Sequence, residues 1–404
     1  MGAEMRTEEL TKIAKRRKLD LVLVANQANI RALTGVNCDN AVLKVERLKS
    51  FKVERLNGFK VERLNGFKVE KFQGCKVEEL QGFKVELLTD FRYVPMVHRV
   101  APKMRVKDLR GFGSARTRDA RRKTRRIGYE ASISHARFLE WQKKFPKAKF
   151  VDISKDLAAI RAVKTPEEIA AIRAAEKLNC EIWETARGKF KAGMTERQMA
   201  RIIQKLMIER GDGEAFATIV CVGKNAAECH HEPDDTVWNG REPVLVDMGV
   251  KLGGVCSDLT RNLVPGFLDD YRGSSNSRNS SASRTARPSR LYKRVYQLVL
   301  DANRAAIAAA KPGMTGRQLD KVARDVIRKG GFGKCFGHSL GHGVGYEVHE
   351  SPYASKKGKM TLKPGMLVTI EPGIYLEDNL GVRIEDLVLI TDTGCEVLSS
   401  SAVK

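Results

Sequence analysis

The feature that most constrains the fold of this chain is an internal duplication in its second half. The nine residues KAGMTERQM, from Lys191 to Met199, return 120 residues later as KPGMTGRQL, from Lys311 to Leu319. Six positions are identical and a seventh exchanges Met for Leu, which is too close a match for a shared helix cap alone. Each copy holds Thr-x-x-Gln, the pattern of a capped helix start. We therefore predict two related halves, each packing helices against strands, that face each other across a cleft.

The rest of the pattern predicts an α/β (α+β) protein of two domains, since 404 residues exceed the usual size of one. A helix over 7–18, an apolar strand over 21–24 and a helix over 134–144 indicate a smaller N-terminal α/β domain over residues 1–155. Thr165 then opens a helix with a complete capping box. Residues 156–404 are predicted to form the duplicated, pseudo-two-fold domain.

Six tandem octads interrupt the N-terminal domain, and they start at Leu43, Phe51, Phe59, Phe67, Cys75 and Phe83. In copies such as FKVERLNG, polar and apolar residues alternate, which favours a half-exposed strand. Asn57-Gly58 and Asn65-Gly66 suit type I′ hairpin turns. We predict a short meander inserted over residues 43–90 into a surface hairpin. A helix is the alternative, because Glu and Arg also suit helices.

The net charge of +24 resembles that of a nucleic-acid-binding protein until the charge is located. Residues 99–126 carry an excess of ten positive charges, and residues 272–294 carry an excess of seven. Both segments have a loop-like composition, whereas a binding face interleaves aromatic residues with its basic ones. The Ser/Arg-rich stretch at about 272–290 is predicted to be a disordered inserted loop. We therefore expect no specific binding of nucleic acid.

The sequence also bears on location. It shows no early apolar run with basic flanks and a cleavage site, and no stretch of about 18 apolar residues. The eight cysteines are scattered and include no CxxC pair. This usage is typical of reduced thiols in a cytosol. A cytoplasmic protein without a membrane partner is predicted.

Four carboxylates stand at corresponding places in the two halves. Asp247 ends the apolar run PVLV, and Asp258 follows a glycine-rich turn and begins a second strand. In the later half, Glu371 ends the run MLVTI, and Glu385 ends GVRI. A buried carboxylate is costly unless a cation accompanies it. Four of them in related contexts therefore indicate a pair of metal ions at the seam between the halves.

Histidine usage points to the same region. Five of the seven histidines fall in two short segments, one with His230 and His231 and one with His338, His342 and His349. Glycines surround the second group and allow the backbone to approach a ligand closely. Three histidines in one glycine-rich stretch indicate a site, whereas His231 is the secondary candidate of its pair.

With these residues in place, the chain resembles the M24 "pita-bread" metallopeptidases, in the branch of Xaa-Pro aminopeptidases and prolidases with a creatinase-like N-terminal domain. The resemblance rests on the strings VDMG, SDLTR, GHSLGHGVGYEVHE, IEPGIY and GVRIED, and it covers the chain apart from the octads and the Ser/Arg loop. It implies that two metal ions are held by a set of five ligands, namely Asp247, Asp258, His342, Glu371 and Glu385. In that set Asp258 and Glu385 would bridge both ions.

The resemblance also assigns the substrate side. The substrate-side histidines of the family fall on His230 and His349, and a further pocket histidine falls on His338. Arg383 matches the arginine that separates this branch from methionine aminopeptidases, and Tyr375 is expected to line the same pocket. Cys229 departs from the family, which commonly has proline before the first histidine; this departure concerns the shape of the pocket and leaves the ligands unchanged.

Four carboxylates and one imidazole suit divalent ions, with Mn²⁺ favoured over Co²⁺, Fe²⁺ or Zn²⁺ by the oxygen-rich set. Two ions about 3.5–4 Å apart can share a water and lower its pKa. We expect Glu371 to act as general base and acid, and His230 and His349 to stabilise the oxyanion. The resemblance further implies hydrolysis of an N-terminal Xaa-Pro bond, by an aminopeptidase or a dipeptidase, and a homodimer.

Three alternatives remain at this point. A creatinase-like amidohydrolase shares the fold but lacks the metal ligands, and a methionine aminopeptidase normally lacks the N-terminal domain. The third alternative is a non-catalytic M24-like module that binds protein or nucleic acid, and its support is the net charge of +24. Such relatives usually lose ligands, whereas this chain keeps all five.

Overall fold

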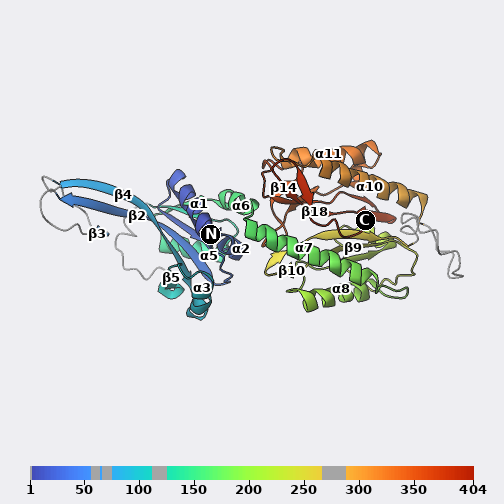
Figure 1. Ribbon diagram of the computed structural model, residues 1–404, viewed down its shortest axis with the longest axis horizontal. Helices are drawn as coiled ribbons and strands as arrows, with labels where there is room; N and C mark the ends of the chain where they lie inside the picture. The colour runs from blue at the N-terminus through green and yellow to red at the C-terminus, as the bar shows by residue number, and fades with distance from the viewer. Residues whose placement is uncertain (1, 56–63, 66–74, 112–124, 266–287) are drawn as a thin grey trace. The chain divides into compact units, whose positions relative to one another are not determined.

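The computed structural model describes residues 2–55, 64–65, 75–111, 125–265 and 288–404. The chain divides into two compact units, Met1–Arg161 and Ala162–Lys404 (Figure 1). Both units mix helices with strands, so the predicted α/β class is confirmed. Among the described helices, none combines the length and the hydrophobicity that a bilayer crossing needs.

The first unit is built on one mixed sheet whose strand order is β5-β4-β2-β1-β6-β7, with β3 pairing β2. Its strands are β1 (Leu21–Val24), β2 (Ala41–Arg55), β3 (Leu64–Asn65), β4 (Cys75–Thr89), β5 (Val106–Asp108), β6 (Arg126–Tyr129) and β7 (Lys149–Asp152). Its α-helices are α1 (Gly2–Arg16), α2 (Gln27–Thr34), α3 (Val94–Val100), α5 (His135–Lys144) and α6 (Ser154–Ala162). Strand β1 is buried at all four positions, as expected of an apolar run in the middle of a sheet that is covered on both faces.

The octad repeat forms the two longest strands of this sheet. β2 and β4 pair antiparallel over fifteen residues, from Ala41 opposite Thr89 to Arg55 opposite Cys75. The strand interpretation is therefore confirmed for these residues, and the helix alternative is wrong there. The predicted turn at Asn57-Gly58 lies outside the described residues, as does Gly66, whereas Asn65 belongs to β3.

The ends of the repeat belong to the core of this unit. Leu43 and Val45 are buried and lie opposite Val24 and Val22 of β1, and Leu87 of the last copy is buried as well. The sequence predicts the whole stretch 43–90 as an insertion. The structure differs because the first and last copies supply apolar residues that the central sheet needs.

The second unit has two halves of similar make-up. The first half contains α7 (Pro166–Arg187), α8 (Glu196–Arg210), β8 (Ile219–Val222), β9 (Val244–Met248), β10 (Lys251–Leu252), β11 (Val255–Cys256) and β12 (Leu259–Leu263). The second contains α10 (Arg290–Ala309), α11 (Gly316–Lys329), β13 (Gly341–Gly343), β14 (Glu350–Ala354), β15 (Leu367–Ile370), β16 (Gly373–Leu376), β17 (Leu380–Arg383), β18 (Asp386–Ile390) and β19 (Cys395–Val397). Within this unit the strands lie between α7 and α8 on one side and α10 and α11 on the other (Figure 1).

The strands of the second unit pair mostly within their own half. The principal sheets are β12-β9-β8 in the first half and β15-β18-β19 in the second, with short pairs β10-β11, β13-β14 and β16-β17. Two of its apolar clusters follow the same division, one between α10, α11 and the later strands and one between α7, α8 and the earlier strands. Helices α8, α10 and α11 thus pack on strands of their own half, whereas a third cluster brings Ile172 of α7 together with Leu367 and Leu387 of the later strands.

The internal duplication is visible at the start of α8 and α11. Both helices begin with a complete capping box, made by Thr195 with Gln198 and by Thr315 with Gln318. The backbone just before each helix pairs with a later segment in the same way, since Thr195 bridges Val237 and Thr315 bridges a threonine at position 361. The predicted pseudo-two-fold arrangement is therefore confirmed at the level of individual backbone contacts.

Candidate metal centre

The two aspartates are positioned by a pair of adjacent strands. Asp247 lies near the end of β9, opposite Thr260 of β12, and Asp258 immediately precedes β12. The tight hairpin β10-β11 between them turns the chain back, as its glycines led us to expect. The two carboxylates therefore reach the same pocket from neighbouring strands.

The other three predicted ligands come from the second half of the unit. His342 lies in β13, Glu371 follows β15, and Glu385 immediately precedes β18. The backbone N–H of Glu385 donates to the carbonyl of Thr260 at 3.2 Å, which joins this half to the first. The five side chains thus meet where the two halves of the duplication adjoin.

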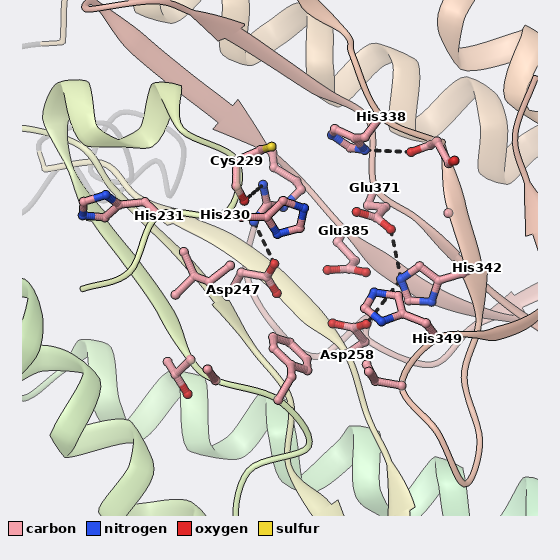
Figure 2. Close-up of a pocket in the computed structure, with 18 of the residues that line it drawn as sticks. Cys229, His230, His231, Asp247, Asp258, His338, His342, His349, Glu371 and Glu385 are labelled. Atoms are coloured by element: carbon pink, nitrogen blue, oxygen red, sulfur yellow. Dashed lines mark hydrogen bonds and ion pairs between the residues drawn. The ribbon is translucent and has the colours of Figure 1, made fainter. Parts of the chain in front are cut away.

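All five side chains line one cavity of about 480 Å³ and point toward a common space (Figure 2). Ligand atoms of Asp258, His342 and Glu385 lie within 4.8 Å of one another. His342 Nε2 lies 3.2 Å from Glu371 Oε1 and 3.7 Å from Asp258 Oδ2. Asp247 faces the same space from the opposite wall (Figure 2).

The charges of this set are unbalanced. Burial and the charges of neighbouring carboxylates raise the pKa of Asp258 and of Glu385 well above their usual values. Burial alone would also raise the pKa of Glu371, but the hydrogen bond and positive charge of His342 outweigh it, and this pKa lies below its usual value. Two buried carboxylates thus lack the positive charge that would hold them ionised.

The donor set fits divalent cations. Asp247 Oδ2 accepts a hydrogen bond from Arg383 Nη2 at 2.7 Å, whereas its Oδ1 is buried without a partner among the described residues. Carboxylate oxygens and a histidine nitrogen that converge in one pocket are the ligands of hard and borderline metal ions. A metal ion here would bind Asp247 Oδ1, and its positive charge would offset the repulsion between the carboxylates of Asp258 and Glu385.

Each half also holds a buried threonine that orients a glutamate of the ligand set, and Thr260 does so across the boundary between the halves. Thr260 Oγ1 donates to Glu385 Oε2 at 2.8 Å, and Thr369 Oγ1 donates to Glu371 Oε1 at 3.2 Å. Sequence reasoning missed both threonines. A signal was present, because each lies two residues from a predicted ligand in an extended segment, where side chains two apart share a face.

A hydrogen-bonded chain extends from the metal ligands along the pocket wall. Arg383 is buried, and its guanidinium reaches Asp247, Thr260 Oγ1 and the Tyr375 hydroxyl, the last at 2.8 Å. The Tyr375 hydroxyl lies 2.9 Å from His338 Nε2. The structure therefore brings together the three residues that the sequence assigned to the substrate pocket and connects them to Asp247, although only His338 and Arg383 line the cavity and Tyr375 bonds to both of them.

The remaining histidines differ in orientation. His230 faces the cavity, and the ring of His349 lies 4.2 Å from that of His342, measured between centroids (Figure 2). Burial and the neighbouring His342 lower the pKa of His349, which favours a neutral ring. His231 points away from the five ligands and bonds to Glu196 (Figure 2).

An apolar wall completes the cavity and was not predicted. The apolar or aromatic side chains that line it include those of Phe216, Ile219, Val348 and Tyr353. Tyr353 lies opposite His342 in the β13-β14 ladder, so strand pairing rather than a sequence motif places it there. Only Val348 falls within a family-like string, GHSLGHGVGYEVHE, and no motif marks Phe216, Ile219 or Tyr353.

Comparison with known proteins gives two matches to protein families. The sequence profile of Metallopeptidase family M24 matches residues 170–392, and that of the Creatinase/Prolidase N-terminal domain matches residues 64–163. The first covers more than half of the chain and includes all five predicted ligands.

Individual proteins resemble parts or all of the chain. A Xaa-Pro dipeptidase of Pyrococcus furiosus is 37% identical over 210 residues, which are 52% of this chain and 55% of that protein. An uncharacterized peptidase of Bacillus subtilis, YqhT, is 36% identical over 212 residues, which are 52% and 54% of the two chains. These matches therefore span about half the length of the curated relatives.

Solved structures match over nearly the full length. The prolidase from Pyrococcus furiosus aligns with a TM-score of 0.76 and 28% identity, over 96% of this chain and 98% of that one. The prolidase from Pyrococcus horikoshii aligns with a TM-score of 0.79 and 26% identity, over 98% of both chains. The fold of this chain thus has counterparts in known structures.

Proposed function

The chain belongs to metallopeptidase family M24, and from this premise we propose that it is a dinuclear-metal-dependent peptidase that hydrolyses an N-terminal Xaa-Pro bond. The observation that carries the proposal is the convergence of four carboxylates and one imidazole on a single cavity. The names of the relatives, Xaa-Pro dipeptidase and prolidase, support the choice of substrate class.

Two divalent cations bound by Asp247, Asp258, His342, Glu371 and Glu385 would supply an activated water and polarise the scissile carbonyl. The oxygen-rich ligand set favours Mn²⁺. Asp258 and Glu385 are the proposed bridging ligands. Their raised pKa values support this role, because each is buried among other carboxylates and gains most from a shared positive charge.

The chain supplies the proton transfers. Glu371 has a pKa held below its usual value by His342, so its carboxylate is ionised and can accept a proton from the attacking water. In our proposal the same group returns the proton to the proline nitrogen as the bond breaks. Thr369 holds one of its oxygens, Oε1, at 3.2 Å, so Oε2 is the atom proposed to carry the proton.

The substrate carbonyl would be held by histidines. We assign His230 and His349, on facing walls of the cavity, to donate hydrogen bonds to the carbonyl oxygen as negative charge develops on it. The chain of His338, Tyr375 and Arg383 offers the polar contacts that would receive the proline end of the peptide. Arg383 also keeps Asp247 in place, so substrate binding and the ligand set share one residue.

The experiment that tests the proposal uses two Xaa-Pro peptides, their two counterparts without proline, and one pair of variants. Purified protein loaded with Mn²⁺ should contain two ions per chain and cleave Ala-Pro, Ala-Pro-Ala or both, while Ala-Ala and Ala-Ala-Ala react far more slowly. Cleavage of the dipeptide alone would identify a dipeptidase, and cleavage of the tripeptide would identify an aminopeptidase. Asp258→Asn should lose both metal and turnover, and Asp235→Asn, at an exposed position beside the pocket, should lose neither.

Loaded protein that cleaves none of these peptides would contradict the proposal and would favour the non-catalytic alternative. The proposal further includes a homodimer, from the family resemblance, and a cytoplasmic location, from the scattered cysteines. Sedimentation of the full chain and fractionation of the source cells test these two parts.

A further inference from the structure

The two capping boxes, Thr195–Gln198 and Thr315–Gln318, differ at one position, which is the first residue of each helix. The copy in the first half has Glu196 after its capping threonine, and the copy in the second half has Gly316. Both positions are fully enclosed in their half of the unit. The difference matters because each helix start adjoins a segment that carries a pocket histidine.

Glu196 holds one such segment from the inside. Its carboxylate is completely buried and accepts four hydrogen bonds. Oε1 accepts from the backbone N–H of Val222 at 2.6 Å and from Asn225 Nδ2 at 2.9 Å. Oε2 lies 2.7 Å from His231 Nε2 and accepts from the backbone N–H of Asp234 at 3.1 Å. The chain between 222 and 234 is therefore wrapped around a single carboxylate.

This cluster is better described as a clamp than as a second metal site. Ligand atoms of Glu196, His231 and Asp234 are close enough together to hold an ion. However, both oxygens of Glu196 already accept hydrogen bonds, and Asp234 Oδ1 accepts one from the backbone N–H of Thr236 at 2.7 Å. A metal ion would have to displace donors that satisfy these acceptors, so the geometry favours a structural role for the carboxylate.

In the second half, the first residue of the helix contacts the histidine-bearing segment through its backbone, because it is a glycine. A Cβ atom on Gly316 would lie 2.0 Å from the carbonyl oxygen of Tyr353, so the helix backbone packs directly on β14. β14 begins at Glu350, immediately after His349. In both halves, then, the first residue of the duplicated helix contacts the segment that presents a substrate-side histidine.

We propose that Glu196 is a positioning residue that fixes His230 in the pocket. Glu196 holds the ring of His231 on the side of α8, and the preceding ring of His230 faces the cavity (Figure 2). The same segment presents the carbonyl of Cys229, which accepts a hydrogen bond from Arg383 Nη1 at 3.3 Å. The inference rests on the proposed function, since it assigns a position to one of the histidines of that reaction.

The test uses Glu196→Gln, because the amide has the same shape but replaces one acceptor oxygen by a donor. We expect kcat/KM for the Xaa-Pro peptide to fall about 10- to 100-fold, the usual cost of releasing a group that orients a functional side chain, with two metal ions still bound per chain. Glu209→Gln, at an exposed position of the same helix, is the matched control and should retain wild-type values.

A double variant separates positioning from general damage. If Glu196 acts through His230, Glu196→Gln should cause little further loss in a His230→Ala background, because the residue it positions is already gone. An equal fold-loss in both backgrounds would overturn the proposal, and so would wild-type kcat/KM in the single variant.

If Glu196→Gln does not fold, His231→Gln serves instead, because it disturbs one of the four bonds and leaves the carboxylate in place. The same comparison with His230→Ala then applies, with the same result expected. Equal losses in the two backgrounds would again overturn the proposal.

Amide hydrogen exchange gives a readout that does not need activity. The N–H groups of Val222 and Asp234 bond to the Glu196 carboxylate. A peptide spanning both should therefore exchange faster in Glu196→Gln than in wild type, and at the wild-type rate in Glu209→Gln. Unchanged exchange in Glu196→Gln would overturn the clamp. If wild-type protein cleaves no peptide while Glu196→Gln still exchanges faster than wild type, the result would contradict the proposed function and leave the clamp supported.

Discussion

Thr260 offers the sharpest test of how the metal ligands are held. Its hydroxyl is completely buried, donates to Glu385 Oε2 at 2.8 Å, and accepts from Arg383 Nε at 3.1 Å. Thr260→Val keeps the shape of the side chain and removes both bonds. We expect the Glu385 carboxylate to lose its fixed orientation and the buried Arg383 Nε to lose its partner.

The magnitude follows from the charges of the partners. A hydrogen bond to a charged group contributes about 1.5–3 kcal/mol. The hydrogen bond from Thr260 orients the Glu385 carboxylate, so its whole contribution should appear in metal binding. Since 1.4 kcal/mol corresponds to a factor of ten, its loss should weaken the binding of metal by roughly 10- to 150-fold. This range agrees with the 10- to 100-fold that is typical for the loss of a group that hydrogen-bonds a metal ligand.

The assay is a titration of metal-free protein with Mn²⁺, followed by calorimetry, for wild type, Thr260→Val and a control. Thr185→Val is the control, because it makes the same change at an exposed position of α7. Metal affinity in Thr260→Val equal to that of wild type would refute the reasoning. It would mean that the orientation of Glu385 is set by the backbone on either side, without help from the hydroxyl.

Three further outcomes are expected. Arg261→Met should lower the free energy of unfolding of the second unit by about 3–5 kcal/mol, because it removes one of the two ion pairs of the buried Asp386 together with the buried hydrogen bonds from Arg261 to backbone carbonyls. Urea unfolding followed by tryptophan fluorescence in a Trp141→Phe background reports it, and a loss below about 1 kcal/mol would contradict it. Burial lowers the pKa of His231 but Glu196 raises it more, to a value above the ordinary one, so the stabilisation from this pair is complete below about pH 6.5 and is lost as pH rises through the raised pKa. The difference in unfolding free energy between wild type and His231→Gln should therefore shrink as pH rises from about 6 to 9, and a constant difference would argue against the ion pair. In metal-free protein, Asp258→Asn should raise the midpoint of thermal unfolding, because it removes one of several crowded carboxylates, while Mn²⁺ should stabilise wild type far more than the variant; a lower midpoint for the metal-free variant would contradict the crowding.

Much of the site could be anticipated because its residues stand at strand ends. A carboxylate at the end of an apolar run is visible in the sequence, and Asp247 and Glu371 are of this kind. The duplication then indicated that two such sets would meet. The structure brings these residues together with His342 in one cavity.

The residues that support the ligands were harder to anticipate. Thr260 and Thr369 act through hydrogen bonds to glutamates, and a threonine in a strand is too common to stand out. The sequence indicates the capped helix start around Glu196 but no contact for its carboxylate, and only the structure shows that the chain folds back over it. Contacts of this kind depend on segments brought together by the fold.

The octads illustrate the opposite difficulty. Alternation predicted their strands, yet the same pattern gave no sign that Leu43 and Val45 of the first copy are core residues. Identical sequences have identical local preferences, so position within the fold decides which copies are buried. Local patterns carry no information about this choice.

The register of β2 and β4 has a consequence for the length of the repeat. Val45 lies opposite Val85 and Val53 opposite Val77, so over the paired residues 43–55 and 75–87 the first two copies meet the last two in the same phase. Because eight is even, one more octad would restore every pair at the base and lengthen each arm by four residues, or about 13 Å. A gain of an odd number of residues would instead turn the side chains of one arm to the wrong face. Replication slippage that adds or removes whole octads therefore leaves the strand pairing of the central sheet unchanged. Proteins that differ in the number of octads can share the same core.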